Sequence, residues 1–209
     1  MAPQHPVERR LTRKGAETRA RIVAEAARLM YEQGTTDATL EDIRDAARVS
    51  GSQIYHYFPD KQALLLAVID HQTQAVLDRQ QPHLGRLDSV AGLRRWRDAL
   101  VEAQRLQQCR GGCPLGGLGS EVAESDPVAR LAVASGFQRW ESAIRSGLAA
   151  MHERGELDAD PEDLALGVLA ALQGGLLLTQ LHRAVRPLEV ALDTVIDHVE
   201  NLTRPAAVR

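Results

Sequence analysis

Aromatic residues and cysteines are scarce in this chain. Only 3% of its 209 residues are Phe, Trp or Tyr, so a core must be filled mostly by Leu, Val and Ala, with Trp96, Phe137 and Trp140 as its rare large side chains. The only two cysteines, Cys109 and Cys113, have a C-x-x-x-C spacing that does not fit a zinc ribbon, and no second pair follows. A metal site and a redox-responsive pair are two alternatives for them, and a structural or pocket-lining role is the favoured one.

A large net charge is missing as well. The formal net charge of -3 argues against a protein that coats nucleic acid indiscriminately. Any contact with DNA must therefore come from a local patch, and basic residues do crowd the start of the chain. They form either a solvated tail or an arm that contacts phosphates or the minor groove. These residues are Arg9, Arg10, Arg13, Lys14, Arg19, Arg21 and Arg28.

Export and membrane signals are not evident. Residues 1–7 lack the apolar core of a signal peptide, which predicts a cytoplasmic protein. The most apolar stretch, residues 164–178, is interrupted by Gln173 and three glycines and falls short of the roughly 20 residues that span a bilayer. We expect this stretch to form a buried helix, and we expect no membrane partner.

Patterns typical of catalysis and cofactor binding are also lacking. The Gly-rich segment 111–119 has neither the Lys-Ser/Thr pair of a P-loop nor a preceding strand, so it does not predict a phosphate site. Histidines are scattered without the H-E-x-x-H spacing, and no serine occupies a strand-to-helix turn. We therefore expect no catalytic residue, no cofactor and no metal.

Helical periodicity is what the chain does have. Apolar residues recur every three or four positions over residues 16–32, 61–80, 88–108, 126–155, 160–182 and 187–202, and no strand pattern separates these segments. With 25% charged and 44% hydrophobic residues, the composition is that of an ordinary globular protein. The sequence predicts an all-α fold.

Residues 39–61 have the pattern of two short helices joined by a tight turn. Thr39 is a good N-cap for a first helix, and Ser50 caps a second helix, with Gln53 three residues on to complete a capping box. Polar and planar side chains remain on the outer faces of the second helix, as in a recognition helix that enters a major groove. The residues expected to contact DNA are Thr39, Ser50, Ser52, Gln53, Tyr55, His56, Tyr57 and Lys61.

Several of these residues have alternative roles. The amide of Gln53 can bond adenine on two atoms, or it can serve only the capping box. Tyr55 either contacts a phosphate or packs on the helix beneath it, and the ring of His56 can face a phosphate or a base edge. Tyr57, Lys61 and the hydroxyl of Thr39 suit phosphates.

Residues 18–68, about a quarter of the chain, resemble the N-terminal domain of the tetracycline-repressor (TetR) family. The resemblance is carried by ETRARIVAEAARLMYEQG, TLEDIRDAARVS and IYHYFPDKQALLLAV. Arg48 stands where the family usually has Gly, so a non-Gly residue must hold the turn, with positive φ as one outcome. Ser52 and Gln53 stand where it usually has Gly-Thr, so no operator sequence carries over.

The resemblance implies a transcriptional regulator, most often a repressor released by a ligand. On this basis residues 1–14 form a basic flexible arm, 15–60 a helix-turn-helix DNA-binding domain, and 61–209 an effector-binding and dimerisation domain. A two-fold dimer would read an inverted-repeat operator in double-stranded DNA. The alternative is an all-α enzyme or small-molecule carrier with an incidental helix-turn-helix resemblance.

The second domain is expected to hold a small, mostly apolar effector, because few charges interrupt its apolar faces. The run GCPLGGLGSE resembles a segment that lies near the ligand pocket in some TetR-type regulators. The pocket is expected to be lined by some of Trp96, Leu100, Cys113, Leu115, Leu118, Phe137, Trp140, Ile144 and Leu177.

A homodimer is expected through the last two helices. Their apolar residues form a surface that we expect to be too broad for one subunit to cover, and small residues let two helix pairs close into a four-helix bundle. The expected interface residues are Val168, Ala171, Leu172, Gly175, Leu178, Val190, Val195, Ile196 and Val199.

Overall fold

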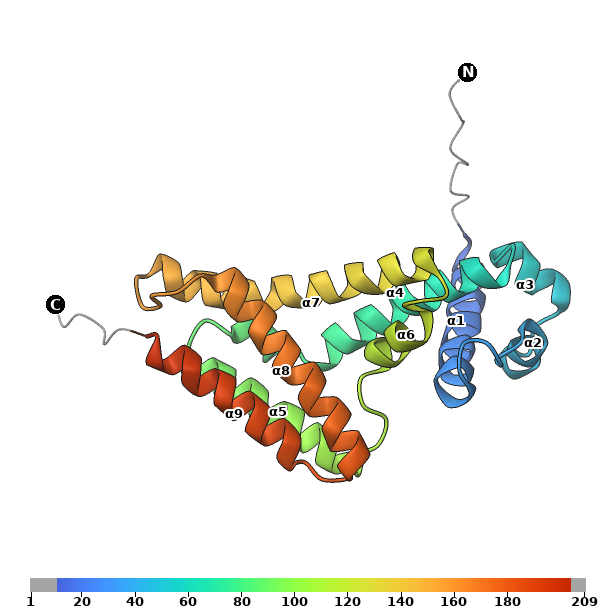
Figure 1. Ribbon diagram of the computed structural model, residues 1–209. Coiled ribbons are helices and arrows are strands. Elements are labelled where there is room, and N and C mark those ends of the chain that lie inside the picture. Colours follow the sequence, from blue (N-terminus) through green and yellow to red (C-terminus); the bar gives the residue numbers. More distant parts are fainter. Residues whose placement is uncertain (1–10, 204–209) are drawn as a thin grey trace, which may run out of the picture. The chain divides into compact units, whose positions relative to one another are not determined.

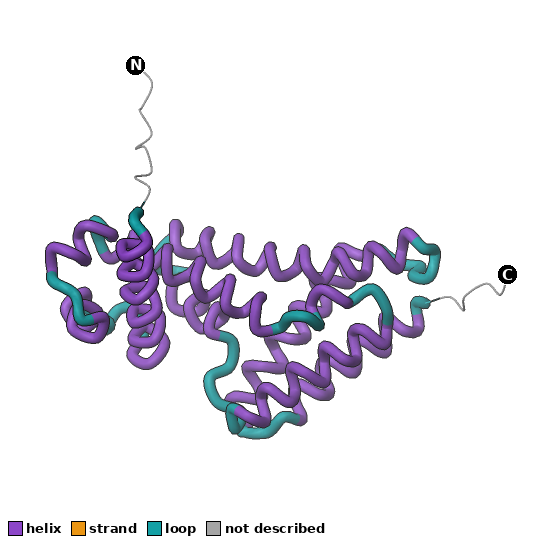
Figure 2. Tube along the Cα trace, turned by 180° about the vertical axis from the view of Figure 1, so that it is seen from behind, coloured by secondary structure: helices purple, strands orange, loops and turns teal. Residues whose placement is uncertain are grey.

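The computed structural model describes residues 11–203. Within this range the chain forms nine α-helices and one 3-10 helix, and its one β-type pairing is an isolated bridge between Leu157 and Thr203 (Figure 1). Figure 2 shows the same trace from behind, with the helices in purple and the connecting loops in teal. The predicted all-α fold is confirmed. The elements are α1 (Arg13–Gln33), α2 (Leu40–Ala47), α3 (Gly51–Tyr57), α4 (Lys61–Arg79), η1 (Leu84–Arg86), α5 (Val90–Leu106), α6 (Pro114–Val122), α7 (Pro127–Glu153), α8 (Pro161–His182) and α9 (Arg186–Asn201).

The chain divides into two compact units, residues 1–71 and 72–209, so the boundary falls inside α4. We expected the boundary after residue 60. Leu64 and Val68, both 0% exposed, lie on the part of α4 that groups with α1, α2 and α3. The first unit therefore includes residues 61–71 of α4. Helical periodicity runs without a break through the whole helix, so it could not predict this boundary.

Aspartate caps set the start of the two longest helices. The carboxylate of Asp126 accepts from the backbone N–H of Ala129 at 2.9 Å, at the start of α7. The carboxylate of Asp160 accepts from the N–H of Glu162 at 2.9 Å, at the start of α8. Each cap satisfies donors that have no partner within the helix, and a proline follows each cap because its missing N–H costs nothing there.

The start of α1 differs from the expectation. The hydroxyl of Thr12 accepts from the N–H of Gly15 at 3.2 Å and caps the helix there. Arg13 and Lys14 are therefore helical and do not belong to the arm predicted for residues 1–14. Residues 1–10 of that arm lie outside the described residues.

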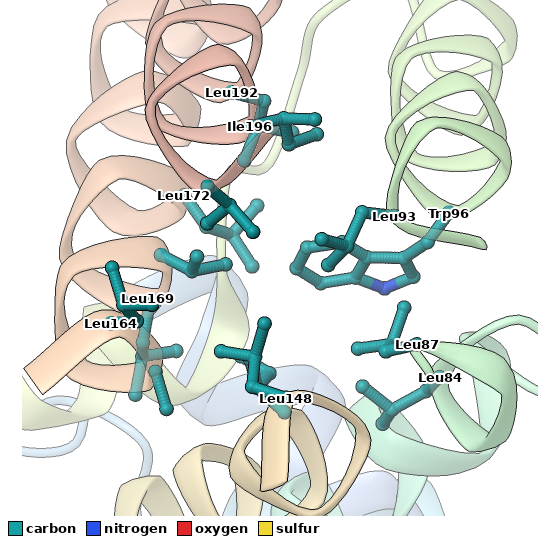
Figure 3. Packing of buried hydrophobic residues seen from close by; sticks show 14 of the residues in the cluster. Leu84, Leu87, Leu93, Trp96, Leu148, Leu164, Leu169, Leu172, Leu192 and Ile196 are labelled. Atoms are coloured by element: carbon teal, nitrogen blue, oxygen red, sulfur yellow. The ribbon is translucent and has the colours of Figure 1, made fainter. Parts of the chain in front are cut away.

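The core of the second unit joins α5, α7, α8 and α9. In Figure 3, Leu172 of α8 and Ile196 of α9 extend toward the space beside Trp96 of α5, and Leu148 of α7 approaches from below. All four side chains are fully buried. Burying a side chain such as leucine contributes about 1.5–3 kcal/mol, so this apolar cluster is the main attraction between the four helices.

Ion pairs join α5 to α9 along the surface of the same unit. Arg94 bonds Asp197 at 2.9 Å, and Arg97 bonds Asp193 at 2.7 Å. Pairs between exposed groups, such as Arg94 and Asp197, contribute about 0–1 kcal/mol each. They fix how α5 and α9 align more than they stabilise the fold.

The length argument against a membrane span was wrong. We expected the apolar stretch to be too short, but α8 has 22 residues and is, by length and composition alone, the one described helix long and apolar enough to cross a membrane. One stripe of α8, with Val168 and Leu172, is fully buried within the second unit, where α8 contacts α7 and α9. This stripe packs as in a core helix, while the opposite face of α8 is exposed in the single chain.

Candidate functional site

The helix-turn-helix begins at α2, which is held by a reciprocal capping box. The N–H of Asp42 donates to the hydroxyl of Thr39 at 3.1 Å, and the N–H of Thr39 donates to the carboxylate of Asp42 at 3.2 Å. The Thr39 hydroxyl also donates to that carboxylate. This places both groups at the exposed start of α2, with the hydroxyl already bonded inside the protein.

The turn between α2 and α3 has the left-handed backbone that we considered for Arg48. Its φ and ψ are 52° and 51°, and its N–H donates to the carbonyl of Asp45 at 3.1 Å. A side chain in this region costs free energy that glycine does not. Asp45 itself receives a hydrogen bond from Arg44, which lowers the pKa of its carboxyl group.

The N-terminus of α3 carries the predicted capping box. The N–H of Gln53 donates to the Ser50 hydroxyl at 3.2 Å, and the N–H of Ser50 donates to the side-chain oxygen of Gln53 at 2.9 Å. The hydroxyls of Ser50 and Ser52 lie 2.9 Å apart. Gln53 is exposed, and its box uses one of two lone pairs on its oxygen and neither amide hydrogen. Capping and base reading are therefore compatible.

Two faces of α3 are clearly separated. Ile54 and Phe58 are 1% and 2% exposed and form the inner side of the unit. Tyr55 is 61% exposed, so the alternative that it packs on the helix beneath it is wrong. His56 is exposed too, and its ring meets that of Tyr57 edge to face at 4.9 Å. The exposed side of α3 therefore presents hydrogen-bonding side chains.

Lys61 is tied to the protein at the start of α4. Its ammonium donates to the backbone carbonyl of Thr36 at 2.9 Å, and the residue is half-buried. An ammonium has three hydrogens, so this bond positions the charge and leaves donors for another partner. Arg19 of α1 lies over the ring of Phe58 at 5.1 Å. The sequence did not point to this contact, because the two residues are far apart in the chain.

Most of the predicted pocket residues are buried or half-buried in the second unit. Trp96, Leu115 and Ile144 are fully buried, Trp140 and Leu118 nearly so, and Leu100, Cys113 and Phe137 are half-buried. Leu177 is 55% exposed, so its assignment to the pocket was wrong. Its position on α8 points away from the core because the residues that pack inward are Val168, Leu172 and Leu176.

The two cysteines lie at opposite ends of the connection from α5 to α6. Cys109 is buried with φ 55°, and its carbonyl accepts from Arg183 at 3.1 Å. Cys113 caps α6, where its sulfur accepts from the N–H of Gly116 at 3.4 Å. Burial raises the pKa of the Cys113 thiol, which keeps it protonated and weakly nucleophilic.

Some buried polar atoms of the second unit lack a hydrogen-bond partner among the described residues. Buried polar groups are nearly always bonded, so such atoms mark places where a further molecule can bind. They are Nε of Arg97, Oε1 of Gln104, Nε1 of Trp140 and Nε2 of Gln173.

Five of the nine residues predicted for the dimer interface are buried within the single chain. Val168, Leu172, Ile196 and Val199 are 0% exposed in the single chain, so their side chains cannot touch a second subunit. Gly175 is buried as well, and a Cβ there would lie 3.0 Å from Cα of Leu188. These residues pack α8 against α9 within one subunit.

A different stripe of α8 is exposed. Leu166, Leu177 and Leu181 are 55%, 55% and 66% exposed, and Ala170 and Gly174 continue the same face at three- and four-residue intervals. We name these five residues the outer stripe. Sequence reasoning missed it because α8 is apolar all round, although the repeat is visible in the sequence. Leu178 and Val190, from the predicted interface, are 45% and 47% exposed, and Ala171 and Val195 are half-buried.

Both parts of the chain match known protein families. Residues 22–68 match the bacterial regulatory proteins of the tetR family, and residues 89–195 match the tetracyclin repressor-like C-terminal domain. An uncharacterised HTH-type transcriptional regulator of Mycobacterium tuberculosis is 30% identical over 186 residues, which cover 82% of this chain and 89% of the relative. The transcriptional regulator AcuR of Cereibacter sphaeroides is 29% identical over 76% of this chain and 74% of AcuR.

Solved structures agree with these matches. A TetR transcriptional regulator from Chloroflexus aurantiacus has a TM-score of 0.76 and 28% identity, covering 93% of this chain and 100% of that one. A regulatory protein TetR from Rhodobacter sphaeroides has a TM-score of 0.73 and 25% identity, covering 87% of this chain and 98% of that one. An enzyme or carrier with an incidental helix-turn-helix is not favoured, because the second unit matches the family as well as the first. The chain belongs to the TetR family of helix-turn-helix transcriptional regulators.

Proposed function

We propose that this regulator is a cytoplasmic homodimeric repressor that binds an inverted-repeat operator and is released by a small, mostly apolar ligand in the second unit. The observation that carries the DNA-binding part is the exposed side of α3, where Ser52, Gln53, Tyr55 and His56 stand opposite the buried Ile54. A short helix with one buried face and a hydrogen-bonding outer face suits a major groove.

We propose that Gln53 reads a base while other exposed groups contact phosphates. Its remaining lone pair and amide hydrogens match the two adenine edge atoms that an amide bonds. Tyr55, Tyr57 and Lys61 are the phosphate contacts, because a phenol and an ammonium each bond a phosphate oxygen without reading sequence. Thr39 and Ser50 act mainly by capping, since their hydroxyls are already bonded to Asp42 and Gln53.

We propose that a second copy of this chain covers the outer stripe of α8. Isolated exposed leucines are common, but a continuous apolar face marks a contact surface. Ala170 and Gly174 lie between the leucines and let two α8 helices approach closely. The family's members typically act as dimers, and this stripe provides a self-complementary surface for one.

The proposal is tested by capturing genomic DNA with the purified full-length protein and sequencing it. We expect one enriched class of sites with two-fold symmetry and half-sites about one helical turn apart. Fluorescence anisotropy on the enriched site should show binding that weakens steeply with salt. Captured DNA without any shared symmetric motif would contradict the proposal.

A further inference from the structure

We propose that the effector of this regulator carries a hydrogen-bond acceptor, in the form of a neutral carbonyl oxygen on an apolar ring body, and that Trp140 and Gln173 donate to it. This inference rests on the proposed ligand-binding function of the second unit. It adds the chemical class of the ligand and the two side chains that select it.

The two tryptophans of the chain differ in the hydrogen bonding of their indole N–H groups. The indole N–H of Trp96 donates to Oε1 of Gln80 at 2.9 Å. The indole N–H of Trp140, 2% exposed, has no partner among the described residues. An indole nitrogen can only donate, so the missing partner at Trp140 must be an acceptor.

The second observation is an amide on the facing helix. Nε2 of Gln173 on α8 is buried and has no partner at hydrogen-bond geometry among the described residues, although this amide acts on the nearby Cys113 thiol and lowers its pKa against the larger effect of burial. Oε1 of the same amide lies 3.1 Å from where a Cβ of Gly116 would stand. The first turn of α6 also borders α7, because a methyl group of Leu115 lies 3.2 Å from the Cβ position of Gly136, one helical turn before Trp140. The amide of Gln173 therefore borders the first turn of α6, and Trp140 lies one helical turn from the residue of α7 that this turn contacts. A carbonyl oxygen has two lone pairs and can accept from two donors.

The surroundings favour a neutral, flat ligand body. Phe137 is half-buried, and its ring lies parallel to that of Trp140, at 2° with centroids 6.4 Å apart. The thiol of Cys113 is kept neutral by burial. Neither proposed donor carries a charge, and the charge of Arg79 is the smallest of the effects on the Cys113 thiol. A buried carboxylate would need a charged partner in direct contact. A ketone or quinone-like ring system fits these groups better than an acid or an amine does.

The position also suggests how occupancy reaches α4. Gly136 faces the second half of α4, where its Cβ position lies 2.5 Å from the Thr73 hydroxyl oxygen. Arg139 of α7 donates to the amide oxygen of Gln74 at 2.7 Å. A ligand held by Trp140 is bound to α7, and α7 directly contacts the part of α4 that belongs to the second unit. Occupancy of the site can therefore reach α4 through α7.

The two indole signals of the ¹⁵N-labelled full-length protein give a direct test. Three ketones, 1-indanone, 1-tetralone and benzophenone, are titrated beside their hydrocarbons indane, tetralin and diphenylmethane. We expect at least one ketone to bind about tenfold more tightly than its hydrocarbon and to move the Trp140 signal downfield, while the bonded Trp96 signal stays in place. Trp140→Phe and Gln173→Leu should each remove the preference for the ketone without weakening binding of the hydrocarbon. Gln138→Leu, at an exposed position of α7, is the matched control and should change neither.

Equal affinity for all three ketone and hydrocarbon pairs would overturn the inference, even if both members of each pair bind. So would a preference for ketones that survives in both variants, or the absence of binding by every ketone. None of these outcomes bears on operator binding, which is measured separately by anisotropy. If the unsubstituted protein does not bind an operator at all, that result counts against the proposed function instead.

Discussion

The two units of this chain differ in how completely their own residues satisfy one another. In the first unit the groups near the DNA-reading surface are bonded locally: two capping boxes hold α2 and α3, and Lys61 is tied to Thr36. In the second unit all four unpartnered buried polar atoms are found, together with the exposed outer stripe. Within residues 11–203, the first unit is thus already ordered by its own hydrogen bonds before it binds DNA. The second unit has an exposed apolar stripe and buried polar atoms without partners among these residues.

This difference separates two kinds of recognition. A rigid, locally bonded helix loses little conformational entropy when it binds DNA. A unit with unsatisfied donors forms hydrogen bonds with a ligand that it does not form by itself. A ligand that forms these bonds better in one conformation than in another shifts the conformational equilibrium. Four sets of variants test this contrast, from the largest expected effect to the smallest.

Replacing the leucines of the outer stripe should have the largest effect. Leu177→Glu with Leu181→Glu is expected to give monomers that remain folded, because each buried leucine contributes about 1.5–3 kcal/mol to an interface and the new carboxylates repel each other. Sedimentation velocity measures the mass, and operator affinity should fall by at least about 100-fold.

Two controls sharpen this experiment. Leu106→Glu, at a position on α5 that is 77% exposed, should stay dimeric. Leu172→Glu, at a fully buried position, should unfold the unit instead of splitting the dimer, because it buries a carboxylate without a partner. A folded, dimeric Leu177→Glu, Leu181→Glu protein would show that the second copy binds elsewhere.

Changing Gln53 tests whether the capping box and base reading are separate. Gln53→Ala should cost about 1–3 kcal/mol in operator affinity and relax preference at one base position per half-site. Gln53→Glu can keep the capping box, yet it should move the preference from adenine toward cytosine, because a carboxylate accepts from the cytosine amino group. The readout is selection from a randomised operator.

The control for Gln53 is Ser50→Ala, which removes the cap hydroxyl and leaves the amide. It should lower stability by about 1 kcal/mol and weaken all sequences alike. An unchanged base preference in both Gln53 variants would make Gln53 a capping residue only and move sequence reading to Ser52 or His56.

Removing the charge of Lys61 should change salt dependence more than specificity. Lys61→Met keeps the aliphatic stem and should flatten the slope of log affinity against log salt by about one unit per half-site, with the base preference intact. Anisotropy at four salt concentrations measures the slope. A slope equal to that of the parent would mean that Lys61 does not contact a phosphate.

The smallest expected effect compares a strained residue from each unit. Arg48 and Arg183 have φ of 52° and 53°, so Arg48→Gly should stabilise the protein by about 0.5–1 kcal/mol. Arg183→Gly should gain less, because it also removes the hydrogen bond to the carbonyl of Cys109. Thermal unfolding measures the gain. If Arg48→Gly also weakens operator binding while Arg183→Gly does not, the strain at Arg48 is retained for contact with DNA.

Local sequence was sufficient for much of the fold and the reading unit. The caps at Asp126 and Asp160, the box of Ser50 and Gln53, and the split between Ile54 and Tyr55 all depend on residues within a few positions of one another. Helical periodicity and capping are short-range properties. They can therefore be predicted from the order of the residues alone.

Only the tertiary structure decided which stripe of α8 faces inward. The helix is apolar on all sides, so its periodicity does not distinguish Leu172, which is buried, from Leu177, which is exposed. Likewise, the sequence contains two tryptophans, but only packing places Gln80 beside the indole of Trp96 and leaves that of Trp140 without a partner among the described residues. Contacts between segments far apart in the chain depend on how whole helices pack, and no local pattern encodes that.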